Sequence, residues 1–306
     1  MTPQKRLLIV LIVILCALVC LVLYLAQSPA APFVEPQRLP SPIRTPIKPK
    51  PKIYRTYLPI LWLNYRQTKK CVGLSIAYDA DKMREVGVRC TYAYGPNAAG
   101  YDSAADEVLG MVYPDAYTVT GKGAYFLGFN EPDLSIGITP QMAAEMWPQI
   151  IAANPRKMAV SPAPSHLHPE WLAQFYAAHV RRWGYPPKLD ALAIHCYNSA
   201  NSCIVTVQQV IDYARAWGIP QVWVTEFAFT EAFQAGYPVG TTWQSEARKF
   251  IDWMDAQAIV TRYYWWALDY DTDVPAQWWS YGWQTQLYNF HEGGLNERGR
   301  FYQERK

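Results

Sequence analysis

The sequence has few of the residues that metal sites need. Its 306 residues include only five histidines, and His166 and His168 form the only His-x-His grouping, with Glu170 close by. No third and fourth ligand follows at a spacing typical of zinc sites. The sequence therefore predicts no bound metal, and it contains no motif that predicts a cofactor.

Net positive charge is confined to the N-terminal part of the chain. Charged residues make up 17% of the sequence, and the formal net charge is +3. Residues 1–55 carry eight basic residues and one acidic residue, so +7 belongs to this part and −4 remains for the rest. Nucleic-acid binding needs a clustered basic surface. A nucleic-acid partner is therefore not expected.

Charge is entirely absent from Leu7 to Ala26, a run of 20 residues that follows Lys5 and Arg6. This run exceeds the 7 to 15 residues of a secretory signal core and is long enough for a membrane-spanning helix. We expect residues 1–27 to form a transmembrane anchor. Small residues after Ala26 leave a cleaved secretory signal as the alternative.

Proline dominates the next segment, with eight prolines between residues 28 and 53. Such a composition predicts an extended, semi-rigid spacer, which we place at residues 28–55. Residues 56–306 then form the folded domain. We expect it to be monomeric and to lie outside the cytoplasm, either anchored to the membrane or secreted after cleavage.

Apolar runs rich in β-branched and aromatic residues recur through the folded domain at nearly regular intervals. The intervals between the later runs leave room for one helix and two loops each. This pattern predicts an α/β fold, a single (β/α)8 TIM barrel, with an open parallel sheet as the alternative. The eight predicted strands are 72–78, 88–94, 108–113, 124–129, 157–161, 189–197, 221–227 and a run ending at Ala267.

Two of these strands end in glutamate. Glu131 follows the fourth strand within Gly128–Asp133, and Glu226 is near the end of the seventh. In barrel enzymes, the active site lies where strands meet their following loops. Hydrolysis of a glycosidic bond needs one carboxylic acid and one carboxylate. The pair therefore predicts glycoside hydrolysis, although Asn-Glu-Pro alone is also a common turn sequence.

Other candidates for sugar binding flank these glutamates. His195 and Tyr197 alternate along the sixth strand, and we expect the Tyr197 hydroxyl to donate to Glu226 and keep it ionised. Both could instead be satisfied polar groups at the barrel mouth. Tyr94 ends the second strand. Trp278 and Trp279 lie in a long loop after Ala267, where they would stack on sugar rings or pack within a lid.

Four motifs occur in the order seen in glycoside hydrolase family 128, and the chain resembles that family from about Cys71 to Tyr302. The motifs are Gly128–Asp133, Leu192–Tyr197, Val224–Phe227 and Arg262–Trp265.

The resemblance implies a retaining endo-β-1,3-glucanase on a (β/α)8 barrel. Glu131 would be the acid/base and Glu226 the nucleophile. Asn130 would contact the 2-hydroxyl of the reacting sugar, and Trp265 would form the sugar platform. A non-catalytic carbohydrate-binding barrel, and a retaining enzyme acting on another glycan such as xylan, remain as alternatives.

Four cysteines lie in the folded domain. Cys196 and Cys203 flank a short segment after the sixth strand, so a local disulfide is expected there in an oxidising compartment. Cys71 and Cys90 form a second, less favoured pair. All four could instead be small buried side chains.

Overall fold

The computed structural model describes residues 69–73, 80–103, 105–134, 137–165, 168–268, 285–288 and 293–305. All of them belong to the second of two compact units, residues 60–306. The predicted anchor, the Pro-rich linker, and the sugar-binding candidates Trp278 and Trp279 lie outside the described residues. Among the residues described, no helix combines the length and apolar character needed to cross a membrane.

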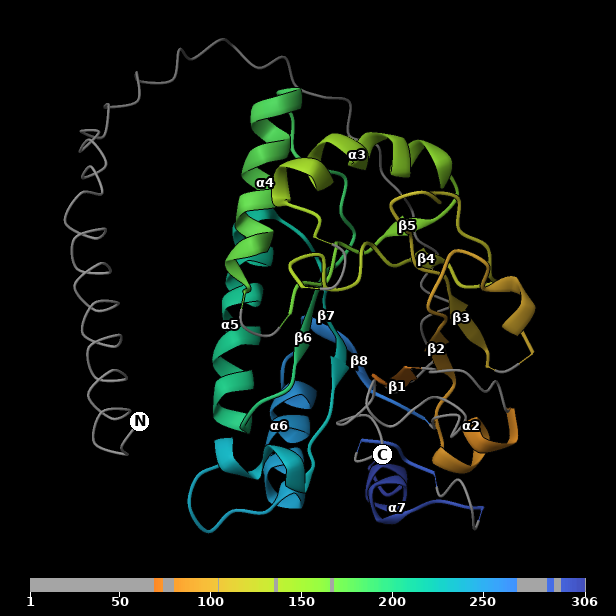
Figure 1. Ribbon diagram of the computed structural model, residues 1–306, viewed down its shortest axis with the longest axis vertical. Coiled ribbons are helices and arrows are strands. Elements are labelled where there is room, and N and C mark those ends of the chain that lie inside the picture. The colour runs from red at the N-terminus through yellow and green to blue at the C-terminus, as the bar shows by residue number, and fades with distance from the viewer. Residues whose placement is uncertain are drawn as a thin grey trace, which may run out of the picture. The chain divides into compact units, whose positions relative to one another are not determined.

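Eight described strands pair in parallel. Six form one sheet in the order β3-β2-β1-β8-β7-β6, and β4 pairs with β5. Two isolated parallel bridges, Met111 with Leu127 and Val160 with Ala191, connect this pair to β3 and β6, so pairing runs around the whole set. The α/β class with parallel strands is thus confirmed, in a TIM-barrel-like ring (Figure 1). The strands are β1 Lys70–Gly73, β2 Cys90–Tyr92, β3 Glu107–Leu109, β4 Tyr125–Phe126, β5 Met158–Ala159, β6 Leu192–Cys196, β7 Val222–Phe227 and β8 Val260–Trp265.

Helices lie around the outside of the strands (Figure 1). Side-chain caps define where several of them begin: Thr139 accepts from the Met142 amide, and Ser199 accepts from the Ser202 amide. Gly218 ends α5 in the left-handed conformation that glycine adopts without strain. The helices are α2 Ala80–Val86, α3 Pro140–Ala153, α4 Glu170–Trp183, α5 Ala200–Trp217, α6 Trp243–Ala256 and α7 Glu297–Gln303, with 3-10 turns η2 Ala99–Tyr101 and η3 Glu231–Gly236.

The core has two layers, because successive side chains of a strand point to opposite faces. One buried cluster fills the inside of the ring and includes Tyr92, Trp223 and Tyr264. The other packs the strands against the helices and includes Phe227 and Trp265. A residue's position in this alternation therefore decides whether its side chain can reach a site inside the ring.

The end of the ring where the strands begin is filled. Arg262 is buried, donates to the Glu107 carboxylate and lies over the Trp223 ring at 4.4 Å. Pairing and hydrogen bonding satisfy this buried charge. Polar side chains at the opposite end, where the strands finish, are therefore the ones available for a functional site.

Candidate active site

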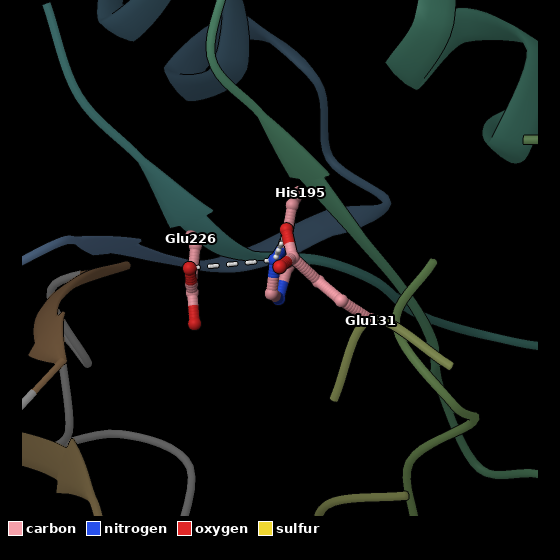
Figure 2. A group of neighbouring side chains, drawn as sticks. All are labelled: Glu131, His195 and Glu226. Atoms are coloured by element: carbon pink, nitrogen blue, oxygen red, sulfur yellow. Dashed lines mark hydrogen bonds and ion pairs between the residues drawn. The ribbon is translucent and has the colours of Figure 1, made fainter. Parts of the chain in front are cut away.

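Three titratable side chains converge where β4, β6 and β7 finish. Figure 2 shows Glu131, His195 and Glu226 pointing toward one another from three separate segments. The Nδ1 atom of His195 lies 3.1 Å from Oε1 of Glu131 and 3.4 Å from Oε2 of Glu226. One atom from each residue can be chosen so that all lie within 4.8 Å of one another. The two predicted glutamates therefore share one site.

A β-bulge brings Glu226 into this site. The pairing of β7 with β8 shifts register between Val224 and Phe227. Thr225 lines a cavity inside the ring, Phe227 packs outward among the helices, and Glu226 lies between them in the site. A bulge re-aims side chains in this way. Strict alternation would give Thr225 and Glu226 opposite faces.

Glu131 adopts a backbone conformation that glutamate rarely does. Its φ is 36°, in the left-handed region, at a cost of about 1–3 kcal/mol. The turn is fixed from both sides: the Glu131 amide donates to the Ala163 carbonyl at 2.9 Å, and the Asp133 carboxylate accepts from the Ser165 amide and hydroxyl. These hydrogen bonds hold the strained turn, and with it Glu131, at the mouth of the ring.

Three tyrosines donate hydrogen bonds to Glu226. Tyr197 donates to Oε2 at 2.6 Å, which is the hydrogen bond predicted from the sequence. Tyr92 donates to Oε1 at 3.1 Å, and Tyr94 donates to the same oxygen. Tyr94 was predicted as a sugar-binding residue, and it lies at the site. The sequence prediction missed Tyr92, although its i, i+2 spacing to Tyr94 repeats that of His195 and Tyr197.

These contacts act on the ionisation of Glu226 in opposite directions. Burial raises the pKa of Glu226 and the nearby Glu131 charge adds to this, whereas His195 and the hydroxyls of Tyr197 and Tyr94 counteract it. Burial also raises the pKa of Tyr92, Tyr94 and Tyr197 well above the usual value, so their hydroxyls stay protonated donors.

The pKa of His195 is raised as well. Burial lowers it, but the neighbouring Glu226 and Glu131 more than offset that effect. His195 is 1% exposed, so its contacts with the two carboxylates are shielded from water. A proton on Nδ1 can therefore be shared between Glu131 and Glu226, which ties their ionisation together.

The aromatic residue at the end of β8 requires a correction. Trp265 was predicted as a sugar platform, but it is fully buried outside the ring, packs against Phe227 at 5.3 Å, and donates to the Thr285 carbonyl. Trp266 is half-buried instead, and its ring meets Tyr197 edge-on at 6.1 Å. Because Tyr264 faces inward, alternation assigns the inward direction to residue 266 rather than 265.

Asn130, which was predicted to contact a sugar hydroxyl, precedes Glu131 at the end of the fourth strand. Its buried Oδ1 accepts no hydrogen bond from the described residues, and the same is true of the Thr225 hydroxyl. Both residues line a cavity of about 10 Å³ inside the ring. The Asn130 acceptor therefore lies beside a space that holds about one water molecule or hydroxyl group.

The four cysteines among the described residues form two disulfides. Cys196 pairs with Cys203, as expected, and the less favoured pair of Cys71 with Cys90 also forms. Cys196 stands between His195 and Tyr197, so the first disulfide fixes the end of β6 against the start of α5.

By distance alone, Glu131, His195 and Glu226 could also ligate a cation. The absence of a metal, predicted from the sequence, stays a prediction. His168 contacts Glu170 at 3.3 Å, and His166 lies outside the described residues.

Known proteins resemble this chain in sequence and in fold. Alkali-sensitive linkage protein 1 of Schizosaccharomyces pombe (strain 972 / ATCC 24843) is 28% identical over 206 residues, which cover 64% of this chain. The matched region spans 37% of that relative, so much of the relative's length has no counterpart here.

Solved structures share the fold. One is an endo-β-1,3-glucanase of glycoside hydrolase family 128 from Amycolatopsis mediterranei in complex with laminaritriose, with a TM-score of 0.59, 23% identity, and coverage of 77% of this chain and 98% of that one. Another is a curdlan-specific exo-β-1,3-glucanase from Blastomyces gilchristii in complex with glucose, with a TM-score of 0.56, 19% identity, and coverage of 77% and 97%.

Membership of a family follows from the sequence itself. Residues 93–302 match the family described as the glycosyl hydrolase catalytic core, and this region holds both glutamates, His195 and Tyr197. The chain therefore belongs to the glycosyl hydrolase catalytic core family and is a glycoside hydrolase, which confirms the family and enzyme class predicted from its motifs.

Proposed function

We propose that this protein is a retaining β-1,3-glucanase in which Glu226 is the nucleophile and Glu131 is the acid/base. The observation that carries the proposal is the convergence of both carboxylates on Nδ1 of His195, within 4.8 Å. Retaining enzymes hold their carboxyl groups about 5–5.5 Å apart, whereas inverting enzymes leave about 6.5–9.5 Å for a water molecule. The short separation supports retention.

The two steps assign opposite work to the glutamates. In the first step Glu131 gives its proton to the leaving glycosidic oxygen while Glu226 attacks the sugar carbon, forming a covalent glycosyl-enzyme. In the second step Glu131 takes a proton from water, whose oxygen displaces Glu226. The buried Glu226 must be ionised to attack, and the three tyrosine donors favour that state.

The other site residues suit a β-glucan. Asn130 presents a buried acceptor for a sugar hydroxyl, and Trp266 offers an aromatic face beside Tyr197. Both solved relatives are named as β-1,3-glucanases, one of them curdlan-specific. β-1,3-Glucan is therefore the proposed substrate, with endo-acting cleavage. Trp278 and Trp279 are proposed as further sugar contacts.

A location outside the cytoplasm is part of the proposal. Both disulfides belong in an oxidising compartment, and the uncharged run from Leu7 to Ala26 is proposed as the anchor or secretion signal.

Product analysis on β-1,3-, β-1,4- and mixed-linkage glycans and on xylan tests this function. We expect release of β-1,3-linked oligosaccharides whose newly formed ends first appear as the β-anomer. Glu226→Gln and Glu131→Gln should each lose several orders of magnitude in kcat/KM. Glu145→Gln, at an exposed glutamate paired with Arg182, is the matched control and should keep full activity.

An aryl β-glucan oligoside with a good leaving group separates the two roles. Such a leaving group needs no protonation, so Glu131→Ala should keep the first step on this substrate, whereas Glu226→Ala should not. An α-anomeric first product would contradict retention. Glycan binding without any turnover would favour the non-catalytic alternative, and turnover of xylan alone would favour the other specificity.

A further inference from the structure

The Tyr92 hydroxyl lies inside the ring and donates a hydrogen bond to Glu226, the proposed nucleophile. We infer that Tyr92 is a positioning residue, which fixes Oε1 of Glu226 and keeps the carboxylate ready to attack; this inference rests on the proposed function of Glu226. The hydroxyl donates to Oε1 at 3.1 Å. Tyr92 is fully buried in the cluster inside the ring, so it acts on the reaction only through Glu226.

The packing around Tyr92 leaves its ring little freedom. It contacts Tyr94 edge-on with ring centroids 5.5 Å apart, and Tyr264 at 5.3 Å. Its strand is tied to β1 by the disulfide between Cys71 and Cys90, two residues before Tyr92. A donor held from several sides fixes its acceptor more strictly than a mobile one.

Gly73 supplies the space for this hydroxyl. A Cβ atom at Gly73 would lie 2.8 Å from the Tyr92 hydroxyl oxygen and 2.9 Å from Cδ1 of Trp266, closer than such atoms ever approach. The backbone of Gly73 is not in the left-handed region, so the absence of a side chain, rather than an unusual φ, is what the position requires. The end of β1 is thus shaped around the Tyr92 hydroxyl and Trp266.

The three tyrosine donors are divided between the two oxygens of the Glu226 carboxylate. Oε1 accepts from Tyr92 and Tyr94, while Oε2 accepts from Tyr197 and faces His195. Tyr94 is half-buried, so a bound sugar can contact it, whereas the fully buried Tyr92 is out of reach of a sugar. Tyr92 therefore remains the constant donor to Oε1 while the contacts nearer the mouth change.

The test is the pH profile of Tyr92→Phe, measured on the full protein with β-1,3-glucan oligosaccharides. Loss of a donor to the ionised carboxylate raises the pKa of Glu226, so kcat/KM should begin to fall at a higher pH as the solution is acidified. We expect this acidic limb to move up by about one pH unit. We also expect kcat/KM at neutral pH to fall roughly 10- to 100-fold, through kcat rather than KM.

Tyr264→Phe is the matched control. Tyr264 is fully buried in the same cluster and packs on Tyr92, but its hydroxyl makes no hydrogen bond to Glu226. It should leave the acidic limb in place. Gly73→Ala is a second variant, which displaces the Tyr92 hydroxyl without removing it and should shift the limb in the same direction. An unmoved limb in Tyr92→Phe, or an equal shift in Tyr264→Phe, would overturn the inference.

A direct titration of Glu226 keeps this test separate from the proposed function. The side-chain carboxyl of Glu226 can be followed by carbon-13 NMR and assigned with Glu226→Gln. Tyr92→Phe should raise this pKa, and Tyr264→Phe should not. If the wild-type protein cleaved no glycan, the proposed function would fail, but the titration would still show whether Tyr92 controls Glu226. An unchanged pKa in an active enzyme would defeat only the inference.

Discussion

Glu226 lies between two opposing influences. It is 4% exposed and close to a second carboxylate, and both conditions disfavour its charge. His195 and the hydroxyls of Tyr197 and Tyr94 favour that charge without removing the cost of burial, and the net effect is a raised pKa. Keeping this charge buried therefore lowers the folding stability, a cost that the proposed role of Glu226 as nucleophile would explain.

Glu226→Gln should for this reason stabilise the fold. A group whose folded pKa lies above its unfolded value contributes stability below the unfolded pKa, and that contribution is lost as the pH rises through the folded pKa. The wild type therefore carries a penalty at neutral pH that the neutral amide avoids. Thermal unfolding from pH 4 to pH 8 should show a higher Tm for Glu226→Gln at pH 8 and a smaller difference at pH 4. Glu145→Gln should show neither effect, and a lower Tm for Glu226→Gln at pH 8 would contradict the account.

Single residues of the site were predictable to different degrees. Glu131 could be found because it follows an apolar strand, Glu226 because it is the last polar residue of another such strand, and Tyr197 because it shares a face with His195. Trp266 could not be separated from Trp265 without the direction of β8, which only the inward Tyr264 settles. Nor could the sequence alone show the bulge that turns Glu226 inward, since it arises from pairing with β8.

Lys69, just before β1, and Lys70, the first residue of β1, join this strand to the ends of two helices. Lys69 donates to the carbonyls of Met254, Asp255 and Gln257 at the end of α6. Lys70 donates to carbonyls at the end of α7, including Tyr302 at 2.9 Å. Helix C-termini present unpaired carbonyls and partial negative charge, which a buried ammonium satisfies.

Lys70→Met should loosen α7 from the barrel. The variant leaves buried carbonyls without a donor, so we expect the free energy of unfolding to fall by about 1–3 kcal/mol. Burial lowers the pKa of Lys70 to about 8. Because its folded pKa lies below its unfolded value, wild-type stability should rise from about pH 8 to pH 10.5, and the variant should lack this rise. Urea unfolding at several pH values measures both effects.

Lys122→Met, at an exposed lysine, is the control and should change stability little. Equal stability of Lys70→Met and the wild type would show that α7 is held by its apolar contacts alone.

Helices were easier to predict than strands. The start of α3 can be read from the sequence, because Thr139 is a possible cap followed by Pro140, and the helix does begin there. The predicted strand at 88–94 is shorter in the structure, where β2 is Cys90–Tyr92. Strand ends depend on where a neighbouring strand stops pairing, and the residues of the strand itself do not predict this point.

The two disulfides brace opposite parts of the ring. One joins β1 to β2, next to Tyr92, and the other joins the end of β6 to α5, next to Tyr197. Each thus lies near a tyrosine that donates to Glu226. Formation of the two disulfides is thereby linked to the positions of the tyrosines that contact Glu226.

Replacing Cys196 and Cys203 together by alanine should lower both stability and activity. We expect the free energy of unfolding to fall by about 2 kcal/mol, because the closed loop is short, and kcat/KM to fall as Tyr197 loses its anchor. Thermal unfolding and kinetics with and without reductant check this, since the wild type should respond to reduction of this bond. Val205→Ala, at an exposed residue of α5, is the control. Unchanged kinetics in the double variant would show that β6 holds Tyr197 unaided.

Glu131 occupies a backbone conformation for which a sequence selected only to fold would use glycine or asparagine. If the activity were dispensable, selection for stability would favour replacing Glu131, because glycine or asparagine adopts this backbone conformation with less strain. Selection for stability and selection for activity therefore favour different residues at position 131. If Glu131 is the proposed acid/base, a descendant that no longer needs catalysis should lose the carboxylate at residue 131 early, and a glutamate at this turn in a related sequence should accompany retained activity.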